Sequence, residues 1–387
     1  MAEPGRRTGL IAGVIAAAIL VPLAAAILSR GGGGRPSSGV APAICAIDPA
    51  DGEVAIAAAI AGCPNGSTIR FPAGRQYRQA HGIVLADRQD LTIDGNGSTF
   101  VNSSDGTVTK AVDGNWIVLR GRNITLKNFT AVGSFTAYQG MPRDLATIGT
   151  GDPAFTEAQM GIGLYGADTV HVEDVTLLNH WGDGVTTGPD EYVDGSTPDY
   201  TRNVFLKRIT VRTVGRMCFG PTSGTNIWIE DSTCTDAWYG GVDAEIDNPN
   251  QPLQGLHILR NTFEGFNHLG IFVPVAAGNV PTRDIEIRDN RFLTLPDKRC
   301  AAPIHVGAYP DSNPATFRNV VVAGNHLQHF GSGIVLDHVE GGIVKGNVLT
   351  RASLPGPTPE GVCGTQFSEP IRVTNSVDVA VDSDGGQ

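Results

Sequence analysis

Three carboxylates stand at every second position of the stretch GGVDAEIDNP, residues 240–249. They are Asp243, Glu245 and Asp247, and apolar residues separate them. Because neighbouring side chains of a β-strand point to opposite faces, the acids would share one face and the apolar residues the other. Two acids spaced in this way have Cα atoms about 6.5 to 7 Å apart. Inverting glycosidases hold their two carboxyl groups about 6.5 to 9.5 Å apart, so the stretch predicts acid–base chemistry on a glycosidic bond.

Two further charged residues, Asp183 in GDGVTTG and Arg216 in RMCFGP, stand at similar places in the preceding part of the chain. Stacked parallel strands lie about 4.8 Å apart, so Asp183 should lie two coils, roughly 10 Å, from Asp243. Crowded acids repel one another, which raises at least one pKa and keeps that group protonated as a general acid. We predict Asp243 and Glu245 as the acid–base pair, with Asp183 supporting or replacing one of them. Arg216 would hold a substrate carboxylate or stabilise developing negative charge.

Aromatic residues gather near the same acids, and sugar rings stack on flat aromatic faces. The predicted substrate-binding residues are Trp181, Trp238, Tyr239 and His305. The alternation also places Cys218 on this outward face. Two other interpretations remain: the acids are solvated strand residues without a role, or they belong to a structural metal site.

The elements that would position these residues form a repeat. A short alternating apolar run followed by Asp, Asn or Gly recurs along the chain, and from residue 170 onward its copies start every 23 to 35 residues. A period of this length indicates a solenoid, and the period-2 alternation makes each unit a β-coil. A second strand follows in most repeats after a short turn. The second strands carry the residues above.

One asparagine follows the first strand in several repeats, at Asn128, Asn261, Asn290, Asn325 and Asn347. Asparagine tolerates the left-handed conformation of tight turns, and stacked asparagine side chains can hydrogen-bond along a solenoid. We therefore expect these residues to form a ladder.

The repeat resembles the right-handed parallel β-helix of the pectate-lyase-like superfamily over roughly residues 45–370. The segment DGEVAIAAAIAGCPNGSTIRFPAGRQY, residues 51–77, resembles the capping helix and first strand that open such proteins. The expected fold class is all-β, a single-stranded right-handed parallel β-helix with an N-terminal capping helix. A helix at this end would cover the open edge of the stacked core.

The resemblance implies a polysaccharide hydrolase or lyase. Polygalacturonase-like hydrolases carry Asn-x-Asp, Asp-Asp, Gly-His-Gly and Arg-x-Lys motifs, of which only GDGV, residues 182–185, is similar here. Pectate lyases use Ca²⁺ and an arginine base, and C5-epimerases begin with the same proton abstraction. The acidic loop 187–202 offers oxygen ligands for Ca²⁺, although no cofactor is certain. A non-catalytic adhesin or polysaccharide-binding β-helix is the third alternative. The preferred reading is a hydrolase using the outward carboxylate pair.

The N-terminal segment predicts export. Arg6 and Arg7 precede 20 uncharged residues, 9–28, which are long enough to span a bilayer. We expect a signal peptide or anchor over 1–28, a flexible linker over 29–43, the β-helix over 44–375 and a polar tail over 376–387. The protein would be secreted or held at the cell surface, touching the membrane only through this segment.

Charge argues against a nucleic-acid partner, and the cysteine count is typical of a protein outside the cell. The net charge of −11, without Lys or Arg clusters, excludes nucleic acid, and GIGLYG, residues 161–166, lacks the following helix of a nucleotide site. An even count of six cysteines favours disulfides outside the cell, with Cys45–Cys63 and Cys218–Cys234 as candidate pairs. We expect a monomer.

Overall fold

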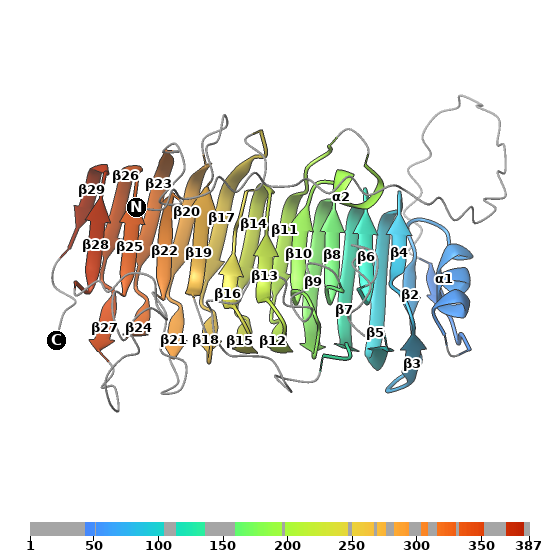
Figure 1. The fold of residues 1–387 in the computed structure, drawn as a ribbon. Helices are drawn as coiled ribbons and strands as arrows, with labels where there is room; N and C mark the ends of the chain where they lie inside the picture. The colour runs from blue at the N-terminus through green and yellow to red at the C-terminus, as the bar shows by residue number, and fades with distance from the viewer. Residues whose placement is uncertain are drawn as a thin grey trace, which may run out of the picture. The chain divides into compact units, whose positions relative to one another are not determined.

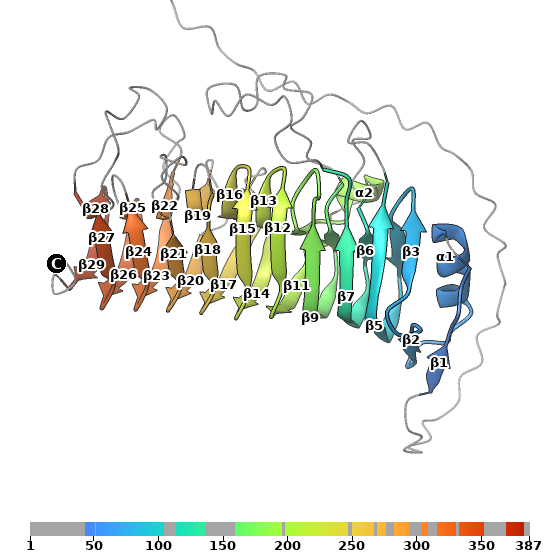
Figure 2. The same ribbon diagram turned by 90° about the horizontal axis from the view of Figure 1, so that it is seen from below.

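Strands of successive coils stack side by side in chain order, and their pairings are parallel throughout the described residues (Figures 1 and 2). The computed structural model describes residues 43–50, 52–103, 114–135, 159–195, 198–246, 250–266, 269–275, 282–293, 303–308, 316–329, 333–351 and 369–382. These residues belong to one unit, Pro42–Gln387. The predicted parallel β-helix is confirmed.

One side of each coil belongs to a ten-stranded sheet, in which neighbouring strands come from neighbouring coils. Its strands are β4 (Ile83–Ala86), β6 (Trp116–Leu119), β8 (Ile162–Tyr165), β10 (Val185–Gly188), β13 (Met217–Pro221), β16 (Gly240–Asp243), β19 (Leu269–Val275), β22 (Ile304–Ala308), β25 (Ile334–Asp337) and β28 (Ile371–Thr374). This sheet carries the second strands of the repeat, and therefore the candidate site.

The rest of each coil belongs to a nineteen-stranded sheet with two regions that meet at a bend. The long strands β5 (Gln89–Asn102), β7 (Arg122–Val132) and β9 (Asp168–Leu178) run through both regions. The first region also contains β1 (Ile44–Ala46), β2 (Thr68–Arg70), β11 (Arg202–Lys207), β14 (Gly224–Glu230), β17 (Leu253–Leu259), β20 (Thr282–Arg288), β23 (Phe317–Ala323), β26 (Val339–Lys345) and β29 (Val377–Val381). The second contains β3 (Gln76–Gln79), β12 (Thr210–Val214), β15 (Thr233–Ala237), β18 (Thr262–Glu264), β21 (Arg291–Leu293), β24 (His326–His329) and β27 (Val348–Arg351).

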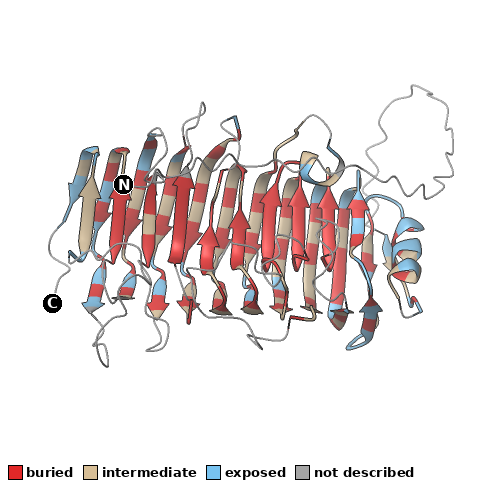
Figure 3. Ribbon diagram, in the orientation of Figure 1, coloured by how far each residue is buried: buried red, intermediate tan, exposed pale blue. Residues whose placement is uncertain are grey.

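The core consists of rows of apolar side chains in register. In the ten-stranded sheet, Phe219 pairs with Val242, Val242 with Ile271, and Ile271 with Ile304, and each is almost completely buried. Figure 3 shows the same burial along most strands between the first and last coils. This rigid register fixes the opposite, outward-facing positions of the same strands.

The asparagine ladder is confirmed for four of its five predicted members. The side-chain amide of Asn261 donates to Asn290 Oδ1, that of Asn290 to Asn325 Oδ1, and that of Asn325 to Asn347 Oδ1, at 2.9 to 3.1 Å. The prediction that Asn128 belongs to the ladder is wrong. Its side-chain amide donates to the Asp94 carboxylate in the bend instead.

The left-handed residue of each ladder turn precedes the asparagine. Arg260, Asp289, Gly324 and Gly346 have φ between 55° and 66°, whereas the ladder asparagines do not have positive φ. The asparagines therefore form the ladder through their side-chain hydrogen bonds. Their ability to adopt a left-handed backbone conformation is not used.

Helix α1 (Glu53–Ala61) caps the first coil, as predicted. Ile56 and Ile60 are buried against the core, and the disulfide Cys45–Cys63 ties the helix end to β1. The second predicted pair, Cys218–Cys234, is also confirmed and joins β13 to β15. Cys300 and Cys363 lie outside the described residues.

The end of the β-helix differs from the predicted boundary at residue 375. Strand β29 (Val377–Val381) pairs with β26, so the solenoid continues into the segment that we expected to be a polar tail. The alternation VDVAV continues the sheet pattern despite the neighbouring Asp and Gly residues. Within the described ranges, no helix has the length and apolar character that crossing a membrane requires. The predicted anchor, 9–28, lies outside them.

Candidate functional site

The stretch with alternating acids forms β16 and the residues after it. Its apolar side chains are buried, as the alternation predicted, at Val242, Ala244 and Ile246. Asp243 and Glu245 are therefore the residues of the opposite, outer face. Asp243 is 5% exposed and Glu245 is half-buried. Asp247 lies outside the described residues.

Asp243 belongs to a row of outward residues that crosses the ten-stranded sheet. It pairs with Phe272, which pairs in turn with His305. On the other side Gly220 stands opposite Asp243, because the preceding residues of the two strands are paired, and Gly220 pairs with Thr186. We call these five residues, Thr186, Gly220, Asp243, Phe272 and His305, the outer row.

The carboxylate of Asp183 reaches this row although Asp183 itself precedes β10. Its Oδ2 accepts a hydrogen bond from Thr186 Oγ1 at 2.8 Å, and its Oδ1 accepts one from the Met217 backbone N–H at 3.1 Å. A Cβ built on Gly220 would overlap Asp183 Oδ2, so the carboxylate fills the space that a side chain at Gly220 would take. The Asp183 carboxylate therefore lies over β13, the strand next to β16, so about one strand spacing, roughly 5 Å, separates its place in the row from that of Asp243. The strands β10 and β16 are two coils apart, as expected, but the Asp183 side chain reaches over the strand between them.

Arg216 lies in the turn before β13 and supports Asp183. Its Nε is 3.7 Å from Asp183 Oδ1, and its side chain is only 12% exposed. The expected outward position of Cys218 is wrong, because Cys218 is fully buried in its disulfide with Cys234. Cys218 and Phe219 are neighbours and both belong to the core, so the alternation of faces begins only at Phe219 and does not extend back to Cys218 or Arg216.

Two tyrosines surround the acids, and each has its pKa raised above the ordinary value. For Tyr239 the main cause is burial, followed by the charges of Asp243 and Glu245, with Arg216 acting in the opposite direction. For Tyr165 the main cause is again burial, followed by the nearby Asp183. Both hydroxyl groups therefore stay protonated at neutral pH, and both lie close to the carboxylates.

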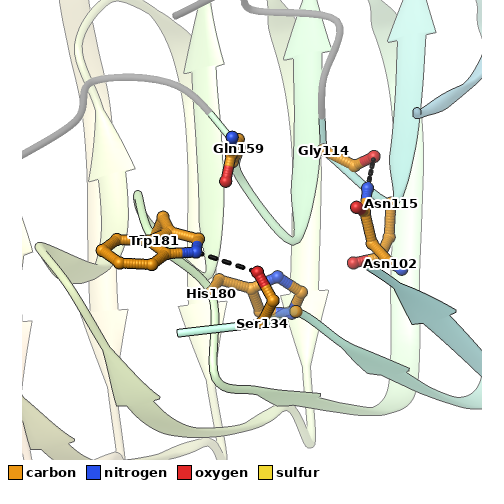
Figure 4. Close-up of a pocket in the computed structure, with 8 residues that line it drawn as sticks. Asn102, Gly114, Asn115, Ser134, Gln159, His180 and Trp181 are labelled. Carbon is orange, nitrogen blue, oxygen red and sulfur yellow. Dashed lines mark hydrogen bonds between the residues drawn. The ribbon is translucent and has the colours of Figure 1, made fainter. Parts of the chain in front are cut away.

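Trp181 lines a small pocket (Figure 4). Its Nε1 donates to Ser134 Oγ at 2.9 Å, and its ring meets Phe135 edge-on at 5.1 Å. The other lining residues are Asn102, Gly114, Asn115, Gly133, Gln159 and His180. The pocket has room for about one water molecule, so it is too small for a sugar ring.

The other predicted aromatic residues differ in accessibility. Trp238 is 3% exposed, so its ring faces are covered and cannot stack on a sugar. Tyr239 and His305 are partly exposed. The His305 ring lies 5.2 Å from that of Phe272, next to Asp243 in the outer row.

Two acids of the predicted Ca²⁺ loop, Asp190 and Asp199, lie beside arginines. Asp190 Oδ2 is 3.5 Å from Arg120 Nη1, and Asp199 Oδ1 accepts a hydrogen bond from Arg202 Nη1 at 3.1 Å. In the described part of the chain, no group of three or more His, Cys, Asp or Glu side chains is arranged to hold a metal ion.

Sequence reasoning missed two residues of the site, Gly220 and Tyr165. Gly220 carries no chemistry of its own, and its importance depends on a carboxylate 37 residues earlier. Tyr165 stands in GIGLYG, which attracted notice only as an imperfect nucleotide motif. Its place opposite Gly188 follows from strand register, which alternation alone does not fix.

Comparisons with known proteins identify the fold. No protein-family model matches the sequence, and no curated protein matches it. A family 28 exopolygalacturonase of Yersinia enterocolitica superimposes with a TM-score of 0.50 at 12% identity, covering 89% of this chain and 79% of the enzyme. The Streptococcus pneumoniae surface adhesin PfbA gives 0.44 at 12% identity, covering 85% and 94%. A polygalacturonase of Erwinia carotovora gives 0.41 at 14% identity, covering 91% and 96%.

The chain thus has the right-handed parallel β-helix fold that the repeat predicted. At these identities the likeness concerns the fold alone, and the chemistry has to be argued from the site.

Proposed function

We propose that the protein is an exported glycoside hydrolase whose acid pair is Asp183 and Asp243. One observation carries this proposal: the Asp183 carboxylate occupies the space above Gly220, next to Asp243 in the outer row. Both carboxylates are almost completely shielded from solvent. Two acids on one face at this distance match the arrangement that glycosidic bond cleavage needs.

The distance between the two carboxylates indicates which role each would have in the reaction. About 5 Å is nearer to the roughly 5 to 5.5 Å of retaining glycosidases than to the wider separation of inverting ones. Asp243 would protonate the leaving oxygen while Asp183, oriented by Thr186 and the Met217 N–H, attacks the anomeric carbon. Water then hydrolyses the glycosyl ester with Asp243 as the base, which restores both carboxyl groups.

The neighbouring groups have supporting roles in this proposal. Glu245 lies two residues beyond Asp243, at a diagonal distance of about 7 to 8 Å from the Gly220 position. If Glu245 were the acid in place of Asp243, the wider pair would give inversion. Arg216 balances the charge of Asp183, and Tyr239 offers a neutral hydroxyl to the acids.

We also propose that the protein works outside the cell. Two disulfides are uncommon in a reducing cytosol, and the apolar segment 9–28 has the composition of an export signal. The polysaccharide would then be extracellular.

The test is incubation of the full-length protein with a panel of neutral and acidic polysaccharides, with and without chelator. We expect new reducing ends, no unsaturated-uronate absorbance, no effect of chelator, and a first product of retained anomeric configuration by proton NMR. Absorbance together with chelator sensitivity would instead indicate a Ca²⁺-dependent lyase. Measurable binding without any cleavage would indicate a polysaccharide-binding protein.

Amide variants identify the acids. Asp243→Asn and Asp183→Asn should each lower kcat by about 10²-fold or more, because a positioned acid or base contributes roughly 10² to 10⁴. Glu340→Gln is the matched control, since Glu340 pairs with Arg318 on the exposed surface of the other sheet. Loss of activity in Glu245→Gln with retention in Asp243→Asn would move the acid to Glu245.

A further inference from the structure

One end of the outer face is covered by apolar side chains. Ile117, Leu119 and Tyr165 point outward from β6 and β8, yet they are 0%, 6% and 2% exposed. They form a cluster separate from the core, and Val193 of helix α2 (Glu191–Asp194) packs against it. The outward face of the β-helix is therefore closed at this point.

The segment that contains α2 is fixed to the β-helix at its first end. Asp190 is 3% exposed, its Oδ1 accepts a hydrogen bond from the Asp199 N–H at 2.8 Å, and its Oδ2 lies 3.5 Å from Arg120 Nη1. Gly166, which has φ of 58°, leaves room for the Asp190 side chain, since a Cβ there would come within 2.9 Å of Asp190 Cβ.

The other end of the segment is fixed as well. The Thr201 hydroxyl lies within hydrogen-bonding distance of the carbonyl oxygens of Leu164 and Gly188, at 3.0 and 2.8 Å. These carbonyls belong to β8 and β10, so this end of the segment is held against two neighbouring strands of the sheet.

Tyr192 of α2 extends this cover to the edge of the acid pair. Its ring stands over Gly188, where a Cβ would lie 3.0 Å from two ring atoms, and it meets the Tyr165 ring edge-on at 6.5 Å. Its hydroxyl accepts a hydrogen bond from Gln251 Nε2 at 3.0 Å. Gly188 is in the same strand as Thr186, which donates to Asp183. We call Tyr165, Tyr192 and Val193 the α2 wall.

The outer row continues beyond Asp243 on the side away from the wall. There it presents Phe272 and then His305, whose rings lie 5.2 Å apart. The kind of side chain on the outer face therefore changes along the β-helix. It is apolar at β8, and it is aromatic and polar at β19 and β22.

We propose that the α2 wall makes the protein end-specific: it accepts only the terminus of a polysaccharide and releases short terminal units. This inference rests on the proposed hydrolase function. The terminal sugar would lie against Tyr192, the exposed residue of the wall that covers Tyr165, and the remaining polymer would run past Phe272 toward the partly exposed His305. The reaction is hydrolysis, in which the anomeric C–O bond breaks, water oxygen bonds to the anomeric carbon, and a water proton ends on the leaving oxygen.

The test compares viscosity with reducing ends during cleavage by the full-length protein, together with the length of the earliest products. We expect mono- or disaccharides from the first time points and a slow fall in viscosity. A rapid viscosity fall with early products of mixed length would overturn end specificity while leaving hydrolysis intact. No reducing ends from any polysaccharide would overturn the hydrolase and the inference together.

A wall variant gives a second measurement. Tyr192→Ala removes the ring above Gly188, so longer products and a severalfold larger viscosity loss per bond cleaved are expected. Tyr192→Phe is the matched control: it keeps the ring, removes the hydroxyl that accepts a hydrogen bond from Gln251, and should give the original product lengths. Equal product patterns for both variants, at unchanged Tm and unchanged turnover, would show that the wall does not select chain ends.

Discussion

Gly220 determines the distance between the two proposed catalytic carboxylates by leaving space for one of them. Asp183 is anchored by Thr186 and the Met217 N–H, and its carboxylate rests where a side chain of β13 would otherwise project. The neighbouring strand then supplies Asp243. At the residue scale, the site therefore depends on two acids and on the smallest residue between them.

Gly220→Ala should show whether activity depends on this geometry, apart from any effect of the substitution on stability. The added methyl group would displace the Asp183 carboxylate, and a displacement of about 1 Å in an active site can cost about 10²-fold in rate. We expect kcat to fall by that order, measured on the polysaccharide that the panel identifies. Gly62→Ala is the control, since a Cβ there would meet its nearest atoms at 3.6 Å. Unchanged kcat in Gly220→Ala would contradict the role given to Asp183.

At the element scale, the asparagine ladder connects the turns of successive coils. Asn290 is completely buried, donates to Ile258 O at 2.8 Å and to Asn325 Oδ1, and accepts from the Asn261 N–H at 2.8 Å. Each rung thus satisfies backbone groups of a neighbouring coil, which hold the strands in register.

Asn290→Ala should destabilise the β-helix by roughly 2 to 4 kcal/mol, because it leaves buried donors and acceptors of two coils unpaired. Urea unfolding followed by circular dichroism measures this change. Asn65→Ala is the comparison, since Asn65 is exposed and accepts from Arg88 at the surface. A cost equal to that of Asn65→Ala would mean that water or a shift of the turn replaces the lost bonds.

The elements and their faces could be predicted from the sequence because alternation is a local signal. Val242 and Asp243 took opposite faces as expected, and the recurring asparagines located the ladder turns. Asp183 and Arg216 lie in turns, where alternation has no phase, so their positions could not be derived in this way. The burial of Trp238 and the space above Gly220 depend on residues in other coils. The sequence of one strand and its turns does not show which residues those are.

At the scale of the whole molecule, one buried histidine should give stability a pH dependence. His180 is 2% exposed, and burial lowers its pKa to about 4, with a hydrogen bond to the Ala131 backbone acting in the opposite direction. The unfolded chain protonates near pH 6.5, while the folded protein does not until about pH 4. Unfolded molecules therefore bind more protons in this window, and stability is lost as pH falls.

The expected loss between pH 6.5 and 4 is about 3 kcal/mol in the free energy of unfolding. Urea titrations at several pH values measure it, and His180→Gln should flatten the profile. His326→Gln, at an exposed position, should leave the profile unchanged. The stability change above pH 5 tests the role of His180 best. Below pH 5, carboxylates whose pKa is lowered, such as Asp94 and Asp337, also change the free energy of unfolding. Identical profiles for His180→Gln and the unsubstituted protein would refute this assignment.

The parallel register of the strands limits how insertions can change the length of the outer row, and with it the length of polymer that the proposed site would contact. Inserting one residue within a strand would turn every following side chain to the opposite face. Inserting a complete coil between β19 and β22 would leave all other pairings intact and lengthen the row by one strand spacing, about 4.8 Å. A β-helix can therefore gain or lose positions of such a row only in whole steps, so in the proposed hydrolase the number of coils beyond Asp243 would set the longest polymer segment that the outer row can hold.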